Sequence, residues 1–133
     1  MPPVSFDINK SINAGGFVRH KIDILAEAAE DTKIGDCDLI ISDTRAHFDG
    51  IRLTMYWRGK GLGMAAYLLA IETSSQQGVP FETQDVHQSE SAKRIWLSLA
   101  EVGLAEEVEP FRPLNKEAHG QQLYAGKYRV PIL

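Results

Sequence analysis

The segment from Trp57 to Met64 carries the clearest chemical signal in the sequence, because it places three glycines and two cations between a strand pattern and a helix pattern. Backbone N–H groups at the start of a helix lack intrahelical partners, and the helix dipole favours negative charge there. Glycines let a phosphate approach the backbone, and Arg58 and Lys60 add positive charge. The segment therefore predicts a pyrophosphate-binding turn, with a purely structural glycine-rich turn as the alternative.

Several kinds of phosphate-binding loop can be compared with this segment. A Walker A loop needs a Gly-Lys step followed by Ser or Thr, and the absence of such a step from the sequence excludes it. A dinucleotide fingerprint fits residues 61–66, with Glu82 or Asp85 about 20 residues further on. That match is the weaker one, because the loop follows antiparallel-looking strands and too little chain remains for further strand–helix–strand units.

The elements that position this turn follow from hydrophobic periodicity and turn residues. Strands are predicted over residues 4–9, 17–29, 34–45 and 51–57, with residues 46–50 as a turn. The composition of 17–29 is helical at its centre, but its apolar residues alternate, which favours a strand. The remaining predictions are a helix over 62–77, a strand over 81–86, a helix from a Ser89 N-cap to Gly103, and a hairpin of 104–111 with 122–130 across the loop 112–121.

This order predicts an α+β fold of three layers in one domain over residues 1–133. The sheet should be mixed, twisted and mainly antiparallel, with two main helices. Strand 51–57, helix 62–77 and strand 81–86 form a strand–helix–strand unit, which implies a central parallel pair with a right-handed crossover.

The composition narrows the protein class. The chain has 133 residues, of which 44% are hydrophobic and 24% charged, as in ordinary globular domains. Its net charge of −4 disfavours general nucleic-acid binding. The single cysteine, Cys37, excludes an intrachain disulfide and fits a reducing cytoplasm. The sequence shows no signal-peptide pattern and no apolar run of the roughly 20 residues that a membrane span needs. We expect a cytoplasmic protein that does not enter a membrane.

Residues 58–63, Arg-Gly-Lys-Gly-Leu-Gly, match the R/Q-x-x-G-x-G/A acyl-CoA loop of the GNAT acetyltransferases, and the chain resembles that superfamily. Residues 53–57 resemble the family strand before this loop, with Met55 in place of the frequent proline. Residues 34–41 resemble its third strand. Residues 89–96 are similar to its second CoA motif, N-x-x-A-x-x-x-Y, with Ser89 in place of asparagine. The specific similarity covers residues 34–103.

The resemblance implies an N-acyltransferase that takes an acetyl group from acetyl-CoA by direct attack of an amine acceptor. Main-chain groups of Leu53 and Met55 would pair with the pantetheine arm, and an amide near Leu53 would polarise the thioester carbonyl. Backbone amides of the glycine loop would hold the pyrophosphate. The cofactor-binding residues implied in this way are Leu53, Met55, Arg58, Gly59, Lys60, Gly61, Leu62, Gly63, Ser89 and Trp96.

Two departures from the family pattern bear on catalysis. Trp96 stands where the family often has a tyrosine that protonates the CoA thiolate. The acid would then be another hydroxyl (Tyr56, Tyr124 or Tyr128) or solvent, or catalysis is weak. The family also has two helices between its first two strands, for which residues 10–20 leave no room. An open acceptor side suits a protein or other large acceptor, or a homodimer partner that supplies the missing wall.

The general base is not defined by the sequence, because several polar residues stand at strand ends. Asp85 and His87 rank first, since they lie near the carboxyl end of a parallel strand and histidine titrates near neutral pH. Together with Tyr124 they are the predicted catalytic residues. The other candidates for the base are His47, Asp49, Glu82 and Gln84.

Two other functions stay open at this point. One is an acyl-CoA-binding protein of weak catalytic power that acts through protein interaction, and the other, further behind, is a nucleotide-binding oxidoreductase. No spacing of His, Cys or carboxylates predicts a metal site. A phage-encoded protein of this kind would act in the host cytoplasm.

Overall fold

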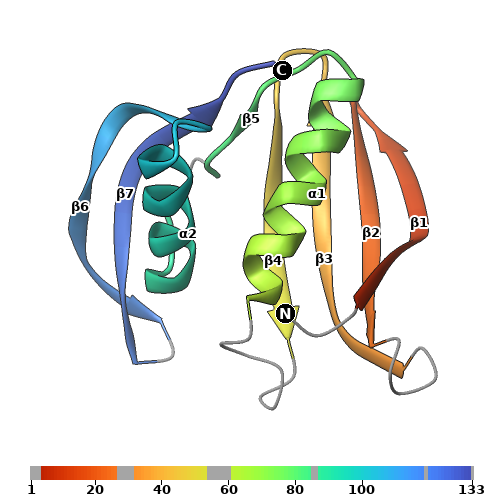
Figure 1. Ribbon diagram of the computed structural model, residues 1–133, viewed down its shortest axis with the longest axis horizontal. Coiled ribbons are helices and arrows are strands. Elements are labelled where there is room, and N and C mark those ends of the chain that lie inside the picture. The colour runs from red at the N-terminus through yellow and green to blue at the C-terminus, as the bar shows by residue number, and fades with distance from the viewer. Residues whose placement is uncertain (1–3, 27–31, 54–60, 85–86, 119, 133) are drawn as a thin grey trace.

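The computed structural model of the chain describes residues 4–26, 32–53, 61–84, 87–118 and 120–132. The strands form one sheet in the order β1-β2-β3-β4-β5-β7-β6 (Figure 1). In chain order the elements are β1 (Val4–Ala14), β2 (Phe17–Ala26), β3 (Thr32–Ser42), β4 (Ala46–Leu53), α1 (Leu62–Gln76), β5 (Phe81–Glu82), α2 (Glu90–Glu101), β6 (Glu106–Ala118) and β7 (Gln121–Val130).

Neighbouring strands pair antiparallel except β4 and β5, which are parallel and joined by α1. This confirms the predicted mixed, mainly antiparallel α+β sheet with a central parallel pair. None of the helices in the described part of the chain has the length and apolarity that a membrane span requires.

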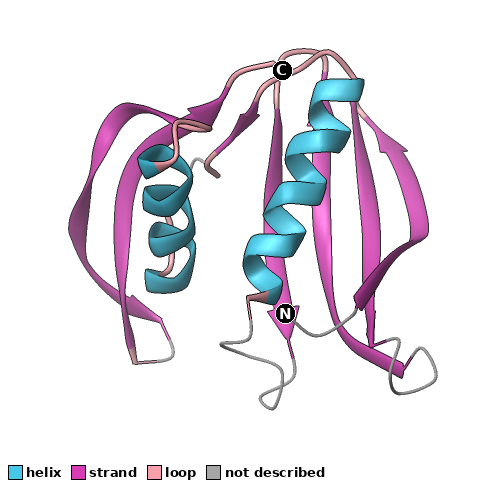
Figure 2. Ribbon diagram, viewed as in Figure 1, coloured by secondary structure: helices cyan, strands magenta, loops and turns pink. Residues whose placement is uncertain are grey.

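Both helices cover the same face of the sheet (Figure 2). The ring of Phe81 on β5 lies against Tyr67 of α1, with ring centroids 5.6 Å apart, and stacks on Trp96 of α2 at 5.3 Å. Three layers were expected, but within the described residues the helices form a single layer on the sheet. No other described element covers the opposite face, since the turn at Gly15 and Gly16 joins β1 directly to β2.

The first two strands are joined directly, as the sequence predicted. Gly15 and Gly16 both adopt positive φ, 55° and 91°, in the tight turn between β1 and β2. The hairpin pairs up to Ala14 and Phe17, so β1 extends past the predicted range 4–9. No helix intervenes between β1 and β2, both of which are described to the turn.

The predicted turn over residues 46–50 is wrong, because β4 begins at Ala46. The chain reverses earlier, where the Ser42 N–H donates to the Arg45 carbonyl at 2.9 Å. The Ser42 hydroxyl also accepts from the amides of Thr44 and Arg45, both at 3.3 Å. The Asp49-Gly50 pair, which suggested a turn, forms an irregularity inside the strand.

Other element ends differ by a few residues. β3 starts at Thr32 and ends at Ser42, and β5 contains only two residues of the predicted 81–86. The last hairpin is longer than predicted, because β6 continues to Ala118 and β7 starts at Gln121. Residues 27–29, 54–57 and 85–86 of the predicted strands lie outside the described residues.

Candidate functional site

The parallel strands β4 and β5 meet at one position and then separate. Within the described chain they pair only at Ala46 and Phe81, where the Ala46 N–H donates to the Pro80 carbonyl at 2.8 Å. The chain after β5 follows β7 instead, since the Thr83 N–H donates to the Tyr128 carbonyl at 3.1 Å. β4 meanwhile continues to Leu53. An extended ligand can add to a strand edge that has lost its neighbour.

A bulge bends β4 just past this branching point. Phe48 pairs with Leu39 of β3 and Ile51 pairs with Cys37, so β4 contains one residue more than β3 over this stretch. Gly50 has a φ of 123°, which glycine adopts without strain. Bulges change the direction of a strand and often stand beside active sites. The bulge accompanies the separation of β4 from β5.

The start of α1 lies at the same end of the sheet as the end of β4 (Figure 1). Gly61 is its N-cap in the left-handed conformation, with no side-chain capping bond and no acidic residue in the first turn. An uncapped helix start without acidic residues suits an anion. Leu62 is 1% exposed and fixes this end by packing with Ile24, Ala26 and Ile34.

Gly63 also has a packing role. A Cβ placed there would lie 3.0 Å from the Cδ1 atom of Ile95 on α2. This glycine therefore lets the two helices approach each other, whatever ligand the loop binds.

The predicted cofactor residues fall into two groups. Met55, Arg58, Gly59 and Lys60 lie outside the described residues, whereas Leu53 is the last residue of β4 and Gly61, Leu62 and Gly63 form the start of α1. Ser89 is the N-cap of α2, as predicted, and its hydroxyl accepts from the Ala92 amide at 3.2 Å.

Trp96 is 1% exposed and lies in the core, against Phe81 and Tyr67. Burial raises the pKa of the Tyr67 hydroxyl, and a hydrogen bond with the Trp96 side chain opposes that rise. The resemblance implies that Trp96 contacts the cofactor, whereas an indole at this position can also belong to the core. Its burial supports the core role, and the cofactor contact stays a prediction.

The start of α2 brings Tyr124 close to the chain segment of His87. The backbones of Tyr124 and Gln88 exchange hydrogen bonds of 2.8 and 2.9 Å, and the Lys93 ammonium lies 4.1 Å from the centroid of the Tyr124 ring. A hydrogen bond from Tyr124 lowers the pKa of Glu90. His87 is half-buried just before this bridge, while Asp85 lies outside the described residues.

On the face of the sheet opposite the helices, a row of charged side chains extends to the point where β4 and β5 separate. Arg19 on β2 contacts both Asp38 and Asp49, each at 2.8 Å, and these carboxylates raise its pKa, Asp49 foremost. Gln84, which follows β5, donates to the other oxygen of Asp49 at 3.2 Å. Asp49 and Gln84 thus link the two separating segments on the uncovered face.

Asp49 was a candidate for the general base that the sequence placed behind Asp85 and His87, and the structure shows where it lies. Its carboxylate is 38% exposed and stands on the β4 bulge, on the open side of the gap. An Asp-Gly pair inside a strictly alternating strand is a signal for a bulge, and bulges cluster at active sites. On that signal, Asp49 could have been ranked together with Asp85 and His87 as a candidate for the general base.

In the part of the chain that the structure describes, the buried thiol and the acidic groups do not gather into a metal site. Burial raises the pKa of Cys37 to about 12, so its thiol stays protonated at neutral pH. Among the described residues, three or more His, Cys, Asp or Glu side chains suited to a metal ion do not gather anywhere.

Solved structures share this arrangement. The S18-alanine N-acetyltransferase of Escherichia coli aligns with a TM-score of 0.59 at 15% identity, over 90% of this chain and 72% of that chain. An acetyltransferase of Bacillus subtilis in complex with CoA aligns with the same score and identity, over 86% and 78%. This chain has the GNAT fold. A nourseothricin acetyltransferase aligns at 0.57 and 14% identity, over 86% of this chain but only 66% of its own length.

At these identities the likeness concerns the GNAT fold itself. No family sequence model matches the chain, and no curated protein matches it in sequence. Three features described above belong to one fold. They are the separation of β4 from β5, the glycine at the start of α1 and the capped start of α2.

Proposed function

We propose that the chain is an acetyl-CoA-dependent N-acyltransferase that acetylates an amine. The observation that carries this proposal is the single parallel pair, Ala46 with Phe81, beyond which β4 runs on without β5. Such a gap accepts the pantetheine arm as an added strand along β4, and the uncapped start of α1 suits the pyrophosphate. The structural neighbours support the same function, one of them in complex with CoA.

The chemistry proposed for this site is direct transfer. The acceptor amine attacks the thioester carbonyl, whose developing oxyanion would be stabilised by a backbone amide near Leu53. The amine must lose a proton, and the CoA thiolate must gain one. Asp49 is our candidate for the proton acceptor, because its exposed carboxylate stands on the open face at the gap, positioned by Gln84 at 3.2 Å. Tyr124 is the candidate proton donor.

The face of the sheet that the helices leave uncovered indicates which kind of acceptor the site suits. Charged side chains on β2, β3 and β4 form ion pairs there, such as Arg19 with Asp38 and Lys33 with Asp36. A polar, charge-balanced face is suited to water or to a large polar acceptor. We therefore favour a protein or other large acceptor over an apolar dimer contact as the missing wall.

A second function is favoured by one observation, the burial of Trp96. The side chain at this position is sealed in the core and carries no acidic hydroxyl. If no other group supplies the proton, the chain would bind acyl-CoA and catalyse transfer weakly or not at all. It would then act through protein interaction.

Calorimetric titration with acetyl-CoA, CoA and NAD tests the cofactor. Gly61→Glu should abolish acetyl-CoA binding, because a carboxylate would occupy the start of α1. Gly78→Glu is the matched control: Gly78 also has positive φ, 74° against 81°, but lies at the other end of the helix. Equal affinity in Gly61→Glu and the parent protein would refute the phosphate-binding turn, and NAD binding alone would favour the oxidoreductase.

Thiol release from acetyl-CoA then separates the enzyme from the binding protein. Asp49→Asn should lower the rate at least tenfold at neutral pH and leave acetyl-CoA affinity unchanged. Asp7→Asn, an exposed aspartate on β1, is the control. Binding without thiol release across amines, peptides and lysate proteins would favour the second function.

A further inference from the structure

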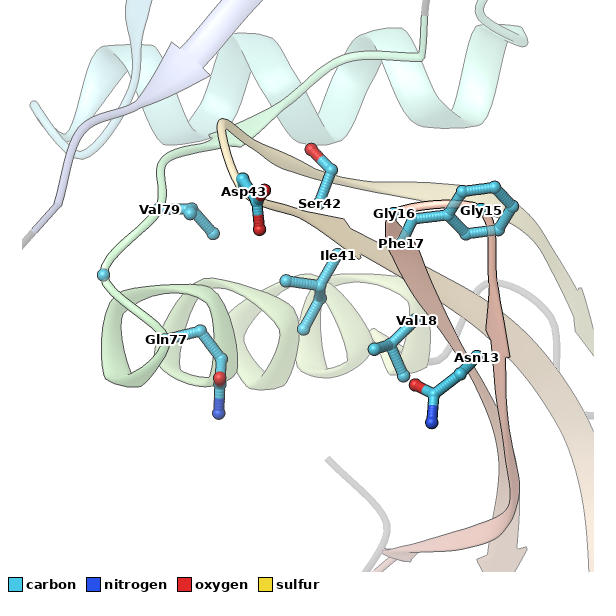
Figure 3. A pocket seen from close by; sticks show the side chains of 11 residues that line it. Asn13, Gly15, Gly16, Phe17, Val18, Ile41, Ser42, Asp43, Gln77 and Val79 are labelled. Carbon is cyan, nitrogen blue, oxygen red and sulfur yellow. The ribbon is translucent and has the colours of Figure 1, made fainter.

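A depression of about 600 Å³ lies beside the C-terminal end of α1, the end opposite to Gly61 (Figure 3). It is formed by three segments: the β1–β2 turn, the β3–β4 turn and the segment that follows α1. Because α1 has 15 residues, its two ends are about 22 Å apart. A group bound in this depression is therefore about that far from the start of α1, where the pyrophosphate is proposed to bind.

The depression has an apolar floor between polar sides. In Figure 3, Ile41 and Val18 lie between Asp43 on one side and the amide side chains of Gln77 and Asn13 on the other. The ring of Phe17 also lines it and is 37% exposed, high for a large apolar side chain. This combination suits a ligand with a short apolar chain and a polar end.

The lining carries one sign of charge. Asp43 is the only ionisable residue among those that line the depression, and none of the described residues forms an ion pair with it. The C-terminal end of α1 reaches the same place, and its last turn contains no basic residue. The carboxylate and the negative end of the helix dipole both favour a cation.

The backbone leaves room for that cation. Gly15, Gly16 and Gly78 all line the depression, and a Cβ added at any of them would meet no atom within 4 Å. The space at the rim is therefore open. The Ser42 hydroxyl is already engaged in its own turn with Thr44 and Arg45, so Asp43 is the principal group offered to a cation.

We propose that this depression is a binding site for an alkylammonium group, with the ammonium at Asp43 and the end of α1 and the alkyl chain over Ile41, Val18 and Phe17. The source of the group is a free aliphatic amine or a lysine side chain of a polypeptide. The site goes beyond the proposed acetylation, because it lies at the opposite end of α1 from the turn proposed to bind the pyrophosphate.

The test is an NMR titration of the ¹⁵N-labelled chain without CoA, so that its outcome does not depend on acyl transfer. The probes are n-pentylamine and the capped peptide Gly-Lys-Gly, at up to about 20 mM, where weak binding is still visible. Their uncharged counterparts are 1-pentanol and the same peptide with norleucine. We expect the amines to shift the amides of Gly16, Asp43 and Gly78, and the uncharged probes to shift them far less.

Asp43→Asn should raise the dissociation constant of pentylamine about three- to fivefold, as expected for an exposed charge pair. Asp7→Asn, an exposed acid on β1, should leave it unchanged. Shifts with one amine only would identify the source as free amine or lysine peptide. Equal shifts by pentanol, equal affinity in Asp43→Asn, or no shift with either amine would overturn the proposal.

Discussion

Replacing Trp96 by phenylalanine tests whether this residue holds the core or walls the cofactor site. The indole is 1% exposed and is hydrogen-bonded with the Tyr67 hydroxyl, itself 5% exposed. Trp96→Phe leaves that hydroxyl without its partner, which costs about 1–3 kcal/mol. The lost ring also leaves a cavity beside Phe81, for about 1 kcal/mol more. We expect a loss of about 2–4 kcal/mol in the free energy of unfolding.

The measurement is urea denaturation of the purified variant, with the midpoint of thermal unfolding as a second readout, expected to fall by about 6–15 °C. Leu97→Ala is the control, because the next side chain is 41% exposed and should cost less than about 1 kcal/mol. A loss below about 1 kcal/mol in Trp96→Phe would refute the packing argument. A tenfold loss of acetyl-CoA affinity in the folded variant would instead show that Trp96 contacts the cofactor.

Further predictions concern the sheet, the thiol and the tyrosine core. Gly126→Ala should cost more than about 2 kcal/mol in urea denaturation, because its Cβ would lie 2.6 Å from a ring atom and 3.0 Å from the Cα of Phe111; a cost under 0.5 kcal/mol would contradict this contact. Cys37 should react with a thiol reagent at pH 8 only as fast as the chain unfolds, since burial raises its pKa to about 12; rapid labelling of the folded chain would show an accessible thiol. Burial, with a hydrogen bond to Glu107, raises the pKa of Tyr128 from 10.0 to about 12, so the folded chain holds this proton more tightly than the unfolded chain. Stability should therefore fall as pH rises from 10 to 12, and Tyr128→Phe should flatten that fall in denaturation curves measured across this range.

Much of the architecture could be predicted because its signals are local. Alternating apolar residues and the Gly15-Gly16 turn define the first hairpin, and the short spacing between its strands predicted that no helix intervenes. The Ser89 cap and the apolar face of α2 were likewise visible in the sequence. Such features depend on neighbours a few residues apart.

The sequence predictions failed where the local structure depends on contacts with residues that are distant in the sequence. The Asp49-Gly50 pair is a turn signal taken alone, but pairing with β3 keeps it inside a strand as a bulge. β5 pairs with β4 at one position only, because the chain after Glu82 stays beside β7. The ion pairs of Asp49 with Arg19 and its bond with Gln84, 30 and 35 residues away in sequence, could not be read from spacing.

The aromatic cluster in the core has a consequence for how the chain unfolds. Within the described residues the sheet is continuous from β4 to β5 through one ladder position. Phe48, Tyr67 and Phe81 contact one another across that weak point, with ring centroids 5.1 to 5.6 Å apart. Cooperativity between the two halves of the sheet therefore rests on side-chain packing rather than on backbone pairing. The ring contacts therefore join the two halves of the sheet at the position where the backbone ladder is thinnest.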